Sequence, residues 1–396
     1  MKITEIIQVK KSKELSKLCH LAKNLYNLSN WYYRQEFFNL GNFLSYYDLD
    51  FILKHHRCYK NLPAQTSQQV LKLVVKNWKS YFRAKREWNM NKFKFKKVPK
   101  IPRYKRKDGE SIVIFTNQNA RIKDDGYLHF PKKCGLKPVK TRIKQLQQVR
   151  IIPLGDIYKI EIIHTREAKD LGLNKDAILG IDLGLNNLIT AVNNKGLKPF
   201  IIKGGNVKSV NHYYNKQLAR HRSIEGKKNN YVDTKKIRRL HLKRNNKIID
   251  HFHKISKNMI KYSKENDIGT IVIGYNEGWK QKCNIGRVNN QKLVQIPFNK
   301  LYQQIAYKGT LIGINVVLID ESYTSKCSFL DGEEIKKQLM YAGKRIKRGL
   351  FKSHNGTIIN ADVNAGYNIM KKAFPNSITD DGIQGLVLNP EIVKIS

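Results

Sequence analysis

A single carboxylate at the end of an apolar run is the first candidate for chemistry. Residues 178–192 read Ile-Leu-Gly-Ile-Asp-Leu-Gly-Leu-Asn-Asn-Leu-Ile-Thr-Ala-Val, an apolar run that ends in Asp182, then a short turn and a second apolar run. This pattern predicts a hairpin that displays the Asp182 carboxylate at the end of a buried strand. A carboxylate in that position needs a polar partner or a metal ion. The structural alternative is an Asp that closes the turn through its own backbone, and the stretch alone favours neither.

A second carboxylate, Asp362, stands where a short strand gives way to a helix. Residues 357–359 form a short β-rich run, and residues 360–368 read Asn-Ala-Asp-Val-Asn-Ala-Gly-Tyr-Asn, where we expect a helix to begin. An N-cap is the structural alternative for Asp362. The two roles are compatible, because a capping residue also has a fixed position from which to bind a ligand.

The elements between these two Asp residues follow the order of an RNase H-like α/β sheet. After the Asp182 hairpin the sequence predicts a strand over 200–202, a basic helical stretch over 206–265, a strand over 270–273, a helix over 297–312 and a strand over 314–319. Nucleases with such a sheet hold two Mg²⁺ ions between carboxylates from separated parts of the chain. Mg²⁺ prefers oxygen ligands, so Asp182 and Asp362 are candidate metal ligands.

The charge of the chain indicates a polyanionic partner. Its 396 residues include 75 Lys plus Arg against 31 Asp plus Glu, which gives a formal net charge of +44. An isolated globule gains nothing from such self-repulsion, so nucleic acid is the partner that the composition favours, ahead of a membrane surface. No window approaches the run of roughly 18 apolar residues that a membrane span needs, and the N-terminus lacks an apolar signal region. We therefore expect a soluble, cytoplasmic protein.

The first half of the chain predicts a barrel with an inserted helical lobe. Residues 1–10 predict a strand, residues 11–38 a helix, and a second helix begins after Pro63. Short β-rich runs follow over 111–115, 127–130, 149–153 and 157–163. We expect residues 1–10 and 92–175 to form a small antiparallel barrel, residues 11–91 to form the helical lobe, and a second lobe to span 176–396.

Four motifs, in the right order along nearly the whole chain, together resemble the TnpB family, the transposon-encoded relatives of type V CRISPR effectors and Fanzor proteins. The motifs are Gly-Ile-Asp182-Leu-Gly-Leu-Asn-Asn-Leu, Leu62-Pro63-Ala64-Gln65 followed by Gln68-Gln69-Val70-Leu71, Ser322-Tyr323-Thr324-Ser325-Lys326-Cys327, and Asn360-Ala361-Asp362-Val363-Asn364-Ala365. The resemblance implies an RNA-guided DNA endonuclease with a guide RNA and double-stranded target DNA as partners. It also implies a wedge-like barrel, a helical recognition lobe and a RuvC-like domain with an Asp, Glu, Asp triad.

The chain departs from the family pattern at the middle Glu of the triad. The family places this Glu directly after the strand that reads Ile271-Val272-Ile273 here, where this chain has Gly274. We expect Glu321, at the end of the next strand, to replace it by reaching across the space that Gly274 leaves. This gives Asp182, Glu321 and Asp362 as catalytic residues and ligands of a two-metal Mg²⁺ site, with Mn²⁺ as an alternative. Glu277, Asp320 or an inactive site are the other interpretations.

A second departure concerns zinc. Family members commonly carry paired Cys-x-x-Cys motifs between the last two catalytic segments, but the five cysteines here form no such pair, and residues 332–353 are a basic insert. The cysteines are Cys19, Cys58, Cys134, Cys283 and Cys327. Their scatter also argues against a disulfide framework. Structural zinc needs about four ligands. We expect no structural zinc, and a target-nucleic-acid loop over about 327–356 that folds through other contacts or on binding.

Two groups of residues are candidates for contact with nucleic acid. By resemblance, Gln65, Gln68 or Gln69 reads a short DNA motif beside the target, since Gln can pair with adenine; surface or capping glutamines are the alternative. The helical stretch 206–265 carries many cations that could neutralise phosphates, although a merely solubilising helix pair is also open. The candidates there are Arg222, Lys235, Arg238, Arg239 and Lys243.

Two other functions compete with the nuclease. One is a nuclease-inactive, RNA-guided DNA-binding repressor, since relatives that have lost nuclease residues resemble transcription factors. The presence of both Asp182 and Asp362 argues for the nuclease, because loss of activity would not be expected to spare them. The other is a strand-joining transposase, which is weaker because the TnpB-like pattern lacks the tyrosine chemistry of its transposon partner. The sequence leaves the oligomeric state open.

Overall fold

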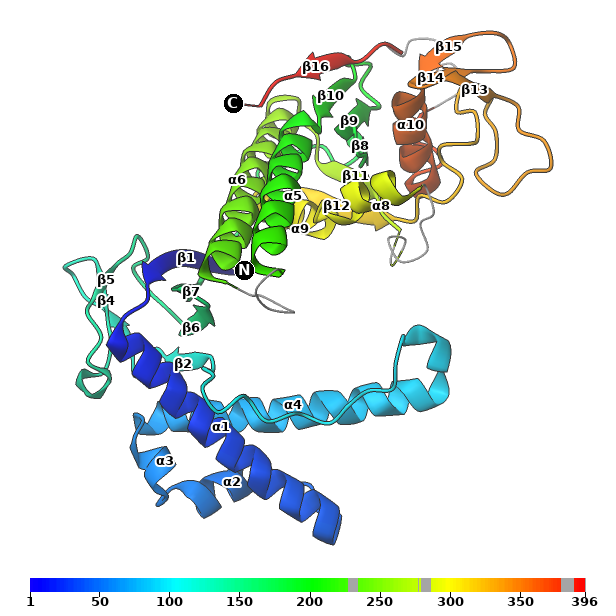
Figure 1. Ribbon diagram of the computed structural model, residues 1–396. Helices are drawn as coiled ribbons and strands as arrows, with labels where there is room; N and C mark the ends of the chain where they lie inside the picture. The colour runs from blue at the N-terminus through cyan, green and yellow to red at the C-terminus, as the bar shows by residue number, and fades with distance from the viewer. Residues whose placement is uncertain (227–233, 277, 279–285, 379–387, 396) are drawn as a thin grey trace. The chain divides into compact units, whose positions relative to one another are not determined.

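The computed structural model describes residues 1–226, 234–276, 278, 286–378 and 388–395 (Figure 1). The chain divides into two compact units, Met1–Arg166 and Glu167–Ser396. The second unit therefore begins before Asp176, where the sequence placed its start. The intervening residues belong to it because the amides of Lys169 and Leu171 donate to the carbonyls of Leu311 (2.9 Å) and Ile312 (3.2 Å). None of the described helices has the length and apolar character to cross a membrane.

The strands of the first unit form two sheets. The larger sheet has the order β1-β7-β6-β2, and the smaller has the order β3-β4-β5. Their bounds are β1 Lys2–Lys10, β2 Val113–Thr116, β3 Arg121–Ile122, β4 Tyr127–His129, β5 Val139–Lys140, β6 Gln148–Leu154 and β7 Ile157–Thr165. The N-terminal strand joins the later ones as expected, pairing with β7 from Lys2↔Thr165 to Lys10↔Ile157. Within residues 1–166, however, the pairing gives two open sheets where the sequence predicted one barrel, because β4 pairs with β3 and β5 only.

Four helices lie between β1 and β2 in the chain. They are α1 Lys13–Leu40, α2 Tyr46–Leu53, α3 Arg57–Lys60 and α4 Ala64–Met90, followed by the short 3-10 turn η1 Lys92–Lys94. α1 and α4 are the two predicted helices, and they share an aromatic core in which Tyr33 stacks on Trp78 with ring centroids 4.5 Å apart. The Trp78 indole also donates to Asn30 on α1 at 2.9 Å. α2 was not predicted, although its capping box of Ser45 and Asp48 was a readable signal.

The second unit is built on a six-stranded sheet with the order β12-β11-β8-β9-β10-β16. Its strands are β8 Ile178–Asp182, β9 Asn187–Asn193, β10 Phe200–Lys203, β11 Thr270–Gly274, β12 Asn315–Ile319 and β16 Glu391–Val393. β8, β9 and β10 are antiparallel neighbours, whereas β11 runs parallel to both β8 and β12. The strand that ends in Gly274 therefore lies between the Asp182 strand and the strand that precedes Glu321, as the sequence predicted.

Helices cover both faces of this sheet (Figure 1). They are α5 Gly205–Gly226, α6 Lys235–Glu265, α8 Arg287–Val294, α9 Phe298–Thr310 and α10 Ala361–Ala373. One apolar core unites Ile181 and Ile271 with Phe252 of α6 and Ile305 of α9. A second core unites Val192 and Val272 with α10. Successive strand residues point to opposite faces, so the two cores divide the strands by alternation.

Two glycines allow α10 to approach β8 closely. A Cβ atom on Gly180 would lie 2.8 Å from the backbone oxygen of Gly366, a contact that requires the backbones to move apart. Gly180 is two residues before Asp182, and Gly366 is one helical turn after Asp362. The close packing therefore places the first turn of α10 beside the end of β8, where both carboxylates lie.

Candidate active site

Asp182 lies at the carboxyl end of β8, partly buried on the side of the sheet that faces α10. Burial, which penalises the charged form, raises the pKa of Asp182 to about 8. The negative charges of Asp362 and Glu321 raise this pKa further, and the Arg345 guanidinium opposes them. The structure therefore brings the three carboxylates predicted from the sequence into one electrostatic neighbourhood, together with an Arg that the sequence did not single out.

Asp362 lies in the first turn of α10 and is not its cap. Asn360 is the N-cap, and its side chain accepts hydrogen bonds from the amides of Asp362 (3.0 Å) and Val363 (3.3 Å). The N-cap interpretation of Asp362 is therefore wrong, and its carboxylate is left for other partners. One oxygen accepts a hydrogen bond from the Asn187 amide at 2.6 Å, and the other lies 3.4 Å from Arg345 of β13 (Lys344–Lys347). A carboxylate in a first turn is also stabilised by the helix dipole.

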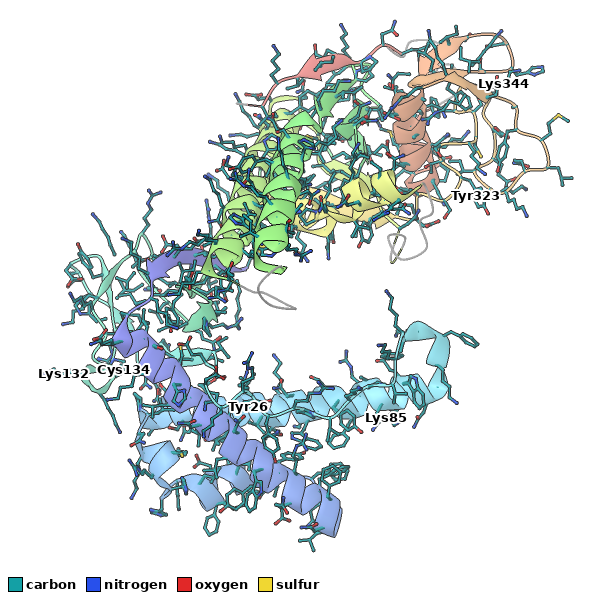
Figure 2. All side chains as sticks on the ribbon, viewed as in Figure 1. Tyr26, Lys85, Lys132, Cys134, Tyr323 and Lys344 are labelled. Carbon is teal, nitrogen blue, oxygen red and sulfur yellow. The ribbon has the colours of Figure 1, made fainter. Side chains whose placement is uncertain are left out.

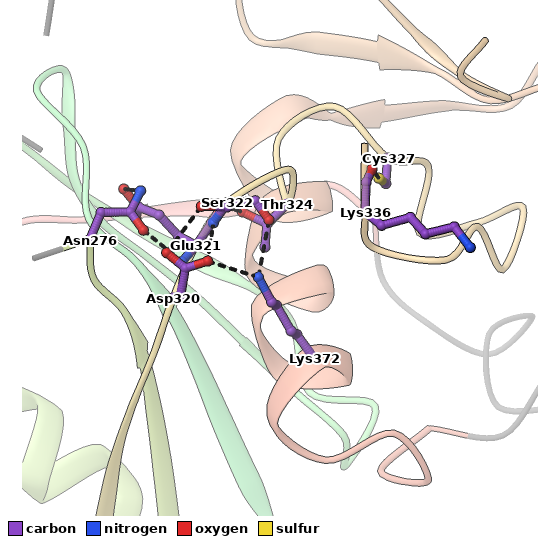
Figure 3. A network of polar contacts seen from close by, with 8 residues as sticks. All are labelled: Asn276, Asp320, Glu321, Ser322, Thr324, Cys327, Lys336 and Lys372. Carbon is purple, nitrogen blue, oxygen red and sulfur yellow. Dashed lines mark hydrogen bonds and ion pairs between the residues drawn. The ribbon is translucent and has the colours of Figure 1, made fainter. Parts of the chain in front are cut away.

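Glu321 lies next to the position that a side chain on residue 274 would take. A Cβ atom built on Gly274 would be 2.5 Å from the Cδ1 of Ile369 and 3.3 Å from the Cβ of Glu321. The absence of a side chain at Gly274 thus leaves room for the Ile369 side chain and for Glu321 beside it. Burial raises the pKa of Glu321 to about 7, with a further contribution from the charge of Asp320. One Glu321 carboxylate oxygen accepts a 3.3 Å hydrogen bond from the Asn276 side chain (Figure 3).

The neighbouring Asp320 is held away from this cluster. Its carboxylate forms an ion pair with Lys372 at 3.1 Å and accepts a hydrogen bond from the Ser322 hydroxyl at 3.0 Å (Figure 3). Burial would raise the pKa of Asp320, but the hydrogen bonds from Ser322 and Lys372 outweigh it and lower that pKa. The opposite pKa directions separate Asp320 from Glu321 and make Glu321 the better candidate. The other alternative, Glu277, lies outside the described residues.

The donor set fits a hard divalent cation such as Mg²⁺ or Mn²⁺. All three candidate ligands are carboxylates, and two have pKa values raised by burial, a cost that a bound cation would relieve. In the described part of the chain, no three His, Cys, Asp or Glu side chains are yet arranged as a ligand group. The reason is visible in their contacts, since Glu321 is turned to Asn276 and Asp362 to Asn187 and Arg345.

Residues 327–360 fold through amide and carboxylate hydrogen bonds. Strands β13, β14 (Leu350–Lys352) and β15 (Ile358–Asn360) form a small antiparallel sheet. Buried Asn364 and Asn368 both donate to the Cys327 carbonyl, at 2.9 and 2.8 Å. The Cys327 thiol lies 3.5 Å from the Glu334 carbonyl, and Glu333 accepts from the Ser328 amide at 2.7 Å. These bonds tie the start of the segment to α10 and to its own backbone.

The three candidate glutamines lie at the start of α4 and differ in their contacts. Gln65 accepts a hydrogen bond from the Thr116 hydroxyl and donates to Gln118. Gln68 hydrogen-bonds to the Tyr59 hydroxyl. Gln69 is half-buried and makes no side-chain hydrogen bond within the described residues. Gln69 is thus the glutamine whose amide is most available to another molecule.

The predicted basic helical stretch is the antiparallel pair α5 and α6. Arg222, Lys235, Arg239 and Lys243 are exposed on it, whereas Arg238 is half-buried. Lys227 and Lys228 lie outside the described residues. A cleft of about 260 Å³ between the two helices is lined by Tyr213, Tyr214, Lys243, Arg244 and Lys247, among others. Tyr213 is 55% exposed there, so an aromatic ring lies beside the two lysines.

A second basic cleft lies in the first unit. It has a volume of about 590 Å³ and lies along α4, with Tyr46 of α2 and Phe95 in its wall. The cations that line it are Lys72, Lys76, Lys79 and Arg83. Their spacing of three and four residues was visible in the sequence, but the aromatic wall was not. Further along α4, Lys85 lies over the Trp88 ring at 4.2 Å (Figure 2).

Three residues at the carboxylate cluster were not singled out in the sequence. Asn187, Asn276 and Arg345 contact Asp362 or Glu321 at separations of 175, 45 and 17 residues along the chain. Asn187 is the second Asn of the Asp182 motif, which was the available signal, whereas no local pattern marks Asn276 or Arg345.

Comparisons with known proteins find two matching family models and two named relatives. Residues 167–280 match the OrfB_IS605 family, described as "Probable transposase", and residues 298–369 match the family "Cas12f1-like, TNB domain". The TnpB-like protein ORF457 of Acidianus two-tailed virus is 24% identical, over 91% of this chain and 83% of that protein. The CRISPR-associated endodeoxyribonuclease Cas12f2 of a Micrarchaeota archaeon is 28% identical over 56% of this chain, and the match spans only 41% of Cas12f2.

One solved structure shares the fold of most of the chain. A cryo-EM structure of a Cas12f1–sgRNA–target DNA complex matches with a TM-score of 0.53 and 17% identity, over 91% of this chain and 83% of that one. At that identity the likeness concerns the fold. The four motifs, the two family models and the named relatives agree that the chain is similar to TnpB-like proteins, which confirms the resemblance seen in the sequence.

Proposed function

We propose that the protein is an RNA-guided, Mg²⁺-dependent DNA endonuclease that cleaves DNA next to a short flanking motif. The observation that carries the proposal is that the charges of Asp362 and Glu321 both act on the buried Asp182 carboxylate at one end of the sheet. Perturbed carboxylates from separate elements are typical of a nuclease site. The relatives add support, since one is named an endodeoxyribonuclease and the Cas12f1 complex contains sgRNA and target DNA.

In this proposal Asp182, Glu321 and Asp362 hold the metal ions. Bound Mg²⁺ would activate the attacking water and stabilise the leaving oxygen of the phosphodiester. Asn187 fixes one oxygen of Asp362, so that the carboxylate keeps its direction. Arg345, half-exposed beside Asp362, balances the negative charge of the cluster before a substrate arrives.

The remaining assignments extend this proposal to nucleic-acid binding. Residues 1–10 and 92–166 form the wedge and residues 11–91 the recognition lobe, in which Gln69 is the best-placed glutamine to read the flanking motif. The exposed cations of α5 and α6 hold phosphates, with Tyr213 available to stack on a base. Guide and target would then be held through their backbones, while base pairing supplies the sequence specificity.

Cleavage of a guide-matched plasmid tests the proposal. The protein, purified with its native RNA, is compared with Asp182→Ala and Asp362→Ala in Mg²⁺ and in EDTA. Asp320→Ala is the matched control, because it removes a neighbouring carboxylate that is tied to Lys372. We expect cleavage by the wild type and by Asp320→Ala in Mg²⁺ only, and none by the other two variants.

The same experiment decides against the proposal if the wild type binds the guide-matched site yet never cuts in any divalent metal. That result would favour the RNA-guided repressor. Cleavage that persists in both Asp182→Ala and Asp362→Ala would place the chemistry elsewhere in the chain.

A further inference from the structure

Glu321 starts one strand further from Asp182 than a Glu at residue 274 would. It follows β12, the strand at the end of the sheet, and must reach past β11 toward Asp182 on β8. A Glu side chain has three rotatable bonds, and holding it in one direction costs conformational entropy. Catalytic groups must nevertheless be held within fractions of an ångström of their productive position. Something in this site must therefore restrain Glu321.

Asn276 makes a two-point contact with Glu321. Its side-chain oxygen accepts the backbone amide of Glu321 at 3.1 Å, and its side-chain nitrogen donates to the Glu321 carboxylate at 3.3 Å (Figure 3). The orientation of the Asn amide follows from chemistry. A backbone N–H can only donate, so the Asn276 oxygen must face it, which turns the nitrogen toward the carboxylate.

The position of Asn276 just after β11 fits this role. The Tyr275 amide donates to the Ile319 carbonyl at 2.8 Å, which completes the pairing of Gly274 with Ile319 at the end of the ladder. Because β11 runs parallel to both β8 and β12, its end lies at the same edge of the sheet as Asp182 and the end of β12. Asn276, two residues beyond Gly274, therefore lies at the edge of the sheet where Glu321 must be held.

The turn after Glu321 anchors the backbone from the other side. The Thr324 hydroxyl donates to the Glu321 carbonyl at 2.8 Å. Tyr323 adopts the left-handed conformation with φ of 70°, which is unusual for a residue with a side chain. These contacts hold the main chain of residue 321 and leave the carboxylate to Asn276.

We propose that Asn276 is a positioning residue that aims the Glu321 carboxylate at the metal site. The inference rests on the proposed nuclease function. Asn276 binds one carboxylate oxygen and leaves the other for a metal ion. Glu321, Gly274 and Asn276 then form one arrangement, in which the missing side chain, the replacement ligand and its restraint depend on one another.

Direct binding of Mn²⁺, followed by electron paramagnetic resonance on the protein with its native RNA, tests this inference without relying on activity. Asn276→Ala removes both hydrogen bonds. Asn276→Leu has nearly the same shape and adds no charge at the metal site, but it can neither accept from the Glu321 amide nor donate to the carboxylate. We expect both variants to raise the Mn²⁺ concentration for half-saturation by about tenfold to a hundredfold, the range for residues that orient metal ligands. Cleavage should recover in part at high Mn²⁺.

The matched control is Asn315→Ala, at the opposite end of β12 and exposed. It should bind Mn²⁺ as the wild type does. Mn²⁺ binding by Asn276→Leu at or above the wild-type affinity would overturn the inference, and this variant decides the matter even if Asn276→Ala fails to fold. Glu321→Gln separates the two proposals. If it binds Mn²⁺ like the wild type, the proposed metal site itself is wrong.

Discussion

The two faces of the six-stranded sheet use the same strands for different purposes. On the face covered by α6 and α9, the inward residues of β8 and β11 are large and apolar, namely Leu179, Ile181, Ile271 and Ile273. On the face covered by α10, β8 presents Gly180 and Asp182, and β11 ends in Gly274. The first face supplies buried apolar area. The second has less apolar packing near the site and instead provides close approach of α10, and it carries the carboxylates of Asp182 and Asp362.

Replacing two neighbouring residues of β8 by Ala should give the largest and most different effects. Asp182→Ala should lower the single-turnover cleavage rate by about 10³-fold or more, because it removes a metal ligand and costs no packing. Ile181→Ala should destabilise the protein by about 2–5 kcal/mol, as expected for a fully buried Ile. The folded fraction of Ile181→Ala should still cleave at nearly the wild-type rate. Rapid-quench kinetics and denaturant titration measure the two effects.

Gly180→Ala should move α10 and so reduce both the stability of the protein and its rate of cleavage. The added methyl group would meet the Gly366 backbone oxygen at 2.8 Å, so the helix must shift and carry Asp362 away from Asp182. We expect a loss of about 1–3 kcal/mol in stability and about 10²-fold in cleavage, since small misplacements of catalytic groups are costly. Gly205→Ala is the matched control, because its Cβ would meet nothing within 4 Å. Equal cleavage by the two variants would contradict the role given to the close packing.

Asp182→Asn should stabilise the metal-free protein. The pKa of about 8 for Asp182 lies above its ordinary value, so the folded state binds more protons than the unfolded state between about pH 4 and pH 8. Stability that depends on Asp182 therefore falls as the pH rises through this window. In EDTA, Asp182→Asn should raise the melting temperature by several degrees at pH 8, about 1 kcal/mol or more, and by less at pH 5. A lower melting temperature at pH 8 would contradict burial of a charge at this position.

The smallest effects should come from the outer surface of α6, whose inner surface packs on the sheet. If about eight cations of the basic helix pair contact phosphates, log affinity should fall with log salt at a slope of about −7. Lys243→Ala should reduce the magnitude of this slope by about 1, for all sequences alike, and leave the chemistry unchanged. Lys261→Ala is the matched control, since Lys261 is already paired with Glu265 at 3.5 Å. A slope near zero would contradict the electrostatic argument.

The sequence predicted those parts of the fold that local patterns determine. The Asp182 hairpin, the long helices and the order of the strands follow from periodicity, and Gly274 with Glu321 followed from comparison with the family pattern. Contacts between distant segments left no local trace, so the contacts that restrain Glu321 and Asp362 emerged only from the structure, although Asn187 itself lies within the Asp182 motif. The predicted barrel was wrong for a related reason, because very short strands pair by tertiary context. An N-cap was the structural alternative for Asp362, but Asn360, two residues earlier, is the residue that caps α10.

The central claim is that Glu321 took over the role of the Glu missing at Gly274. The most direct test is single-turnover cleavage of a guide-matched target in Mg²⁺ by Glu321→Gln and Glu277→Gln, each with its native RNA and with target binding measured separately. We predict that Glu321→Gln binds the target normally but cleaves at least about 10³-fold more slowly, whereas Glu277→Gln cleaves at close to the wild-type rate. The reverse result would contradict the account.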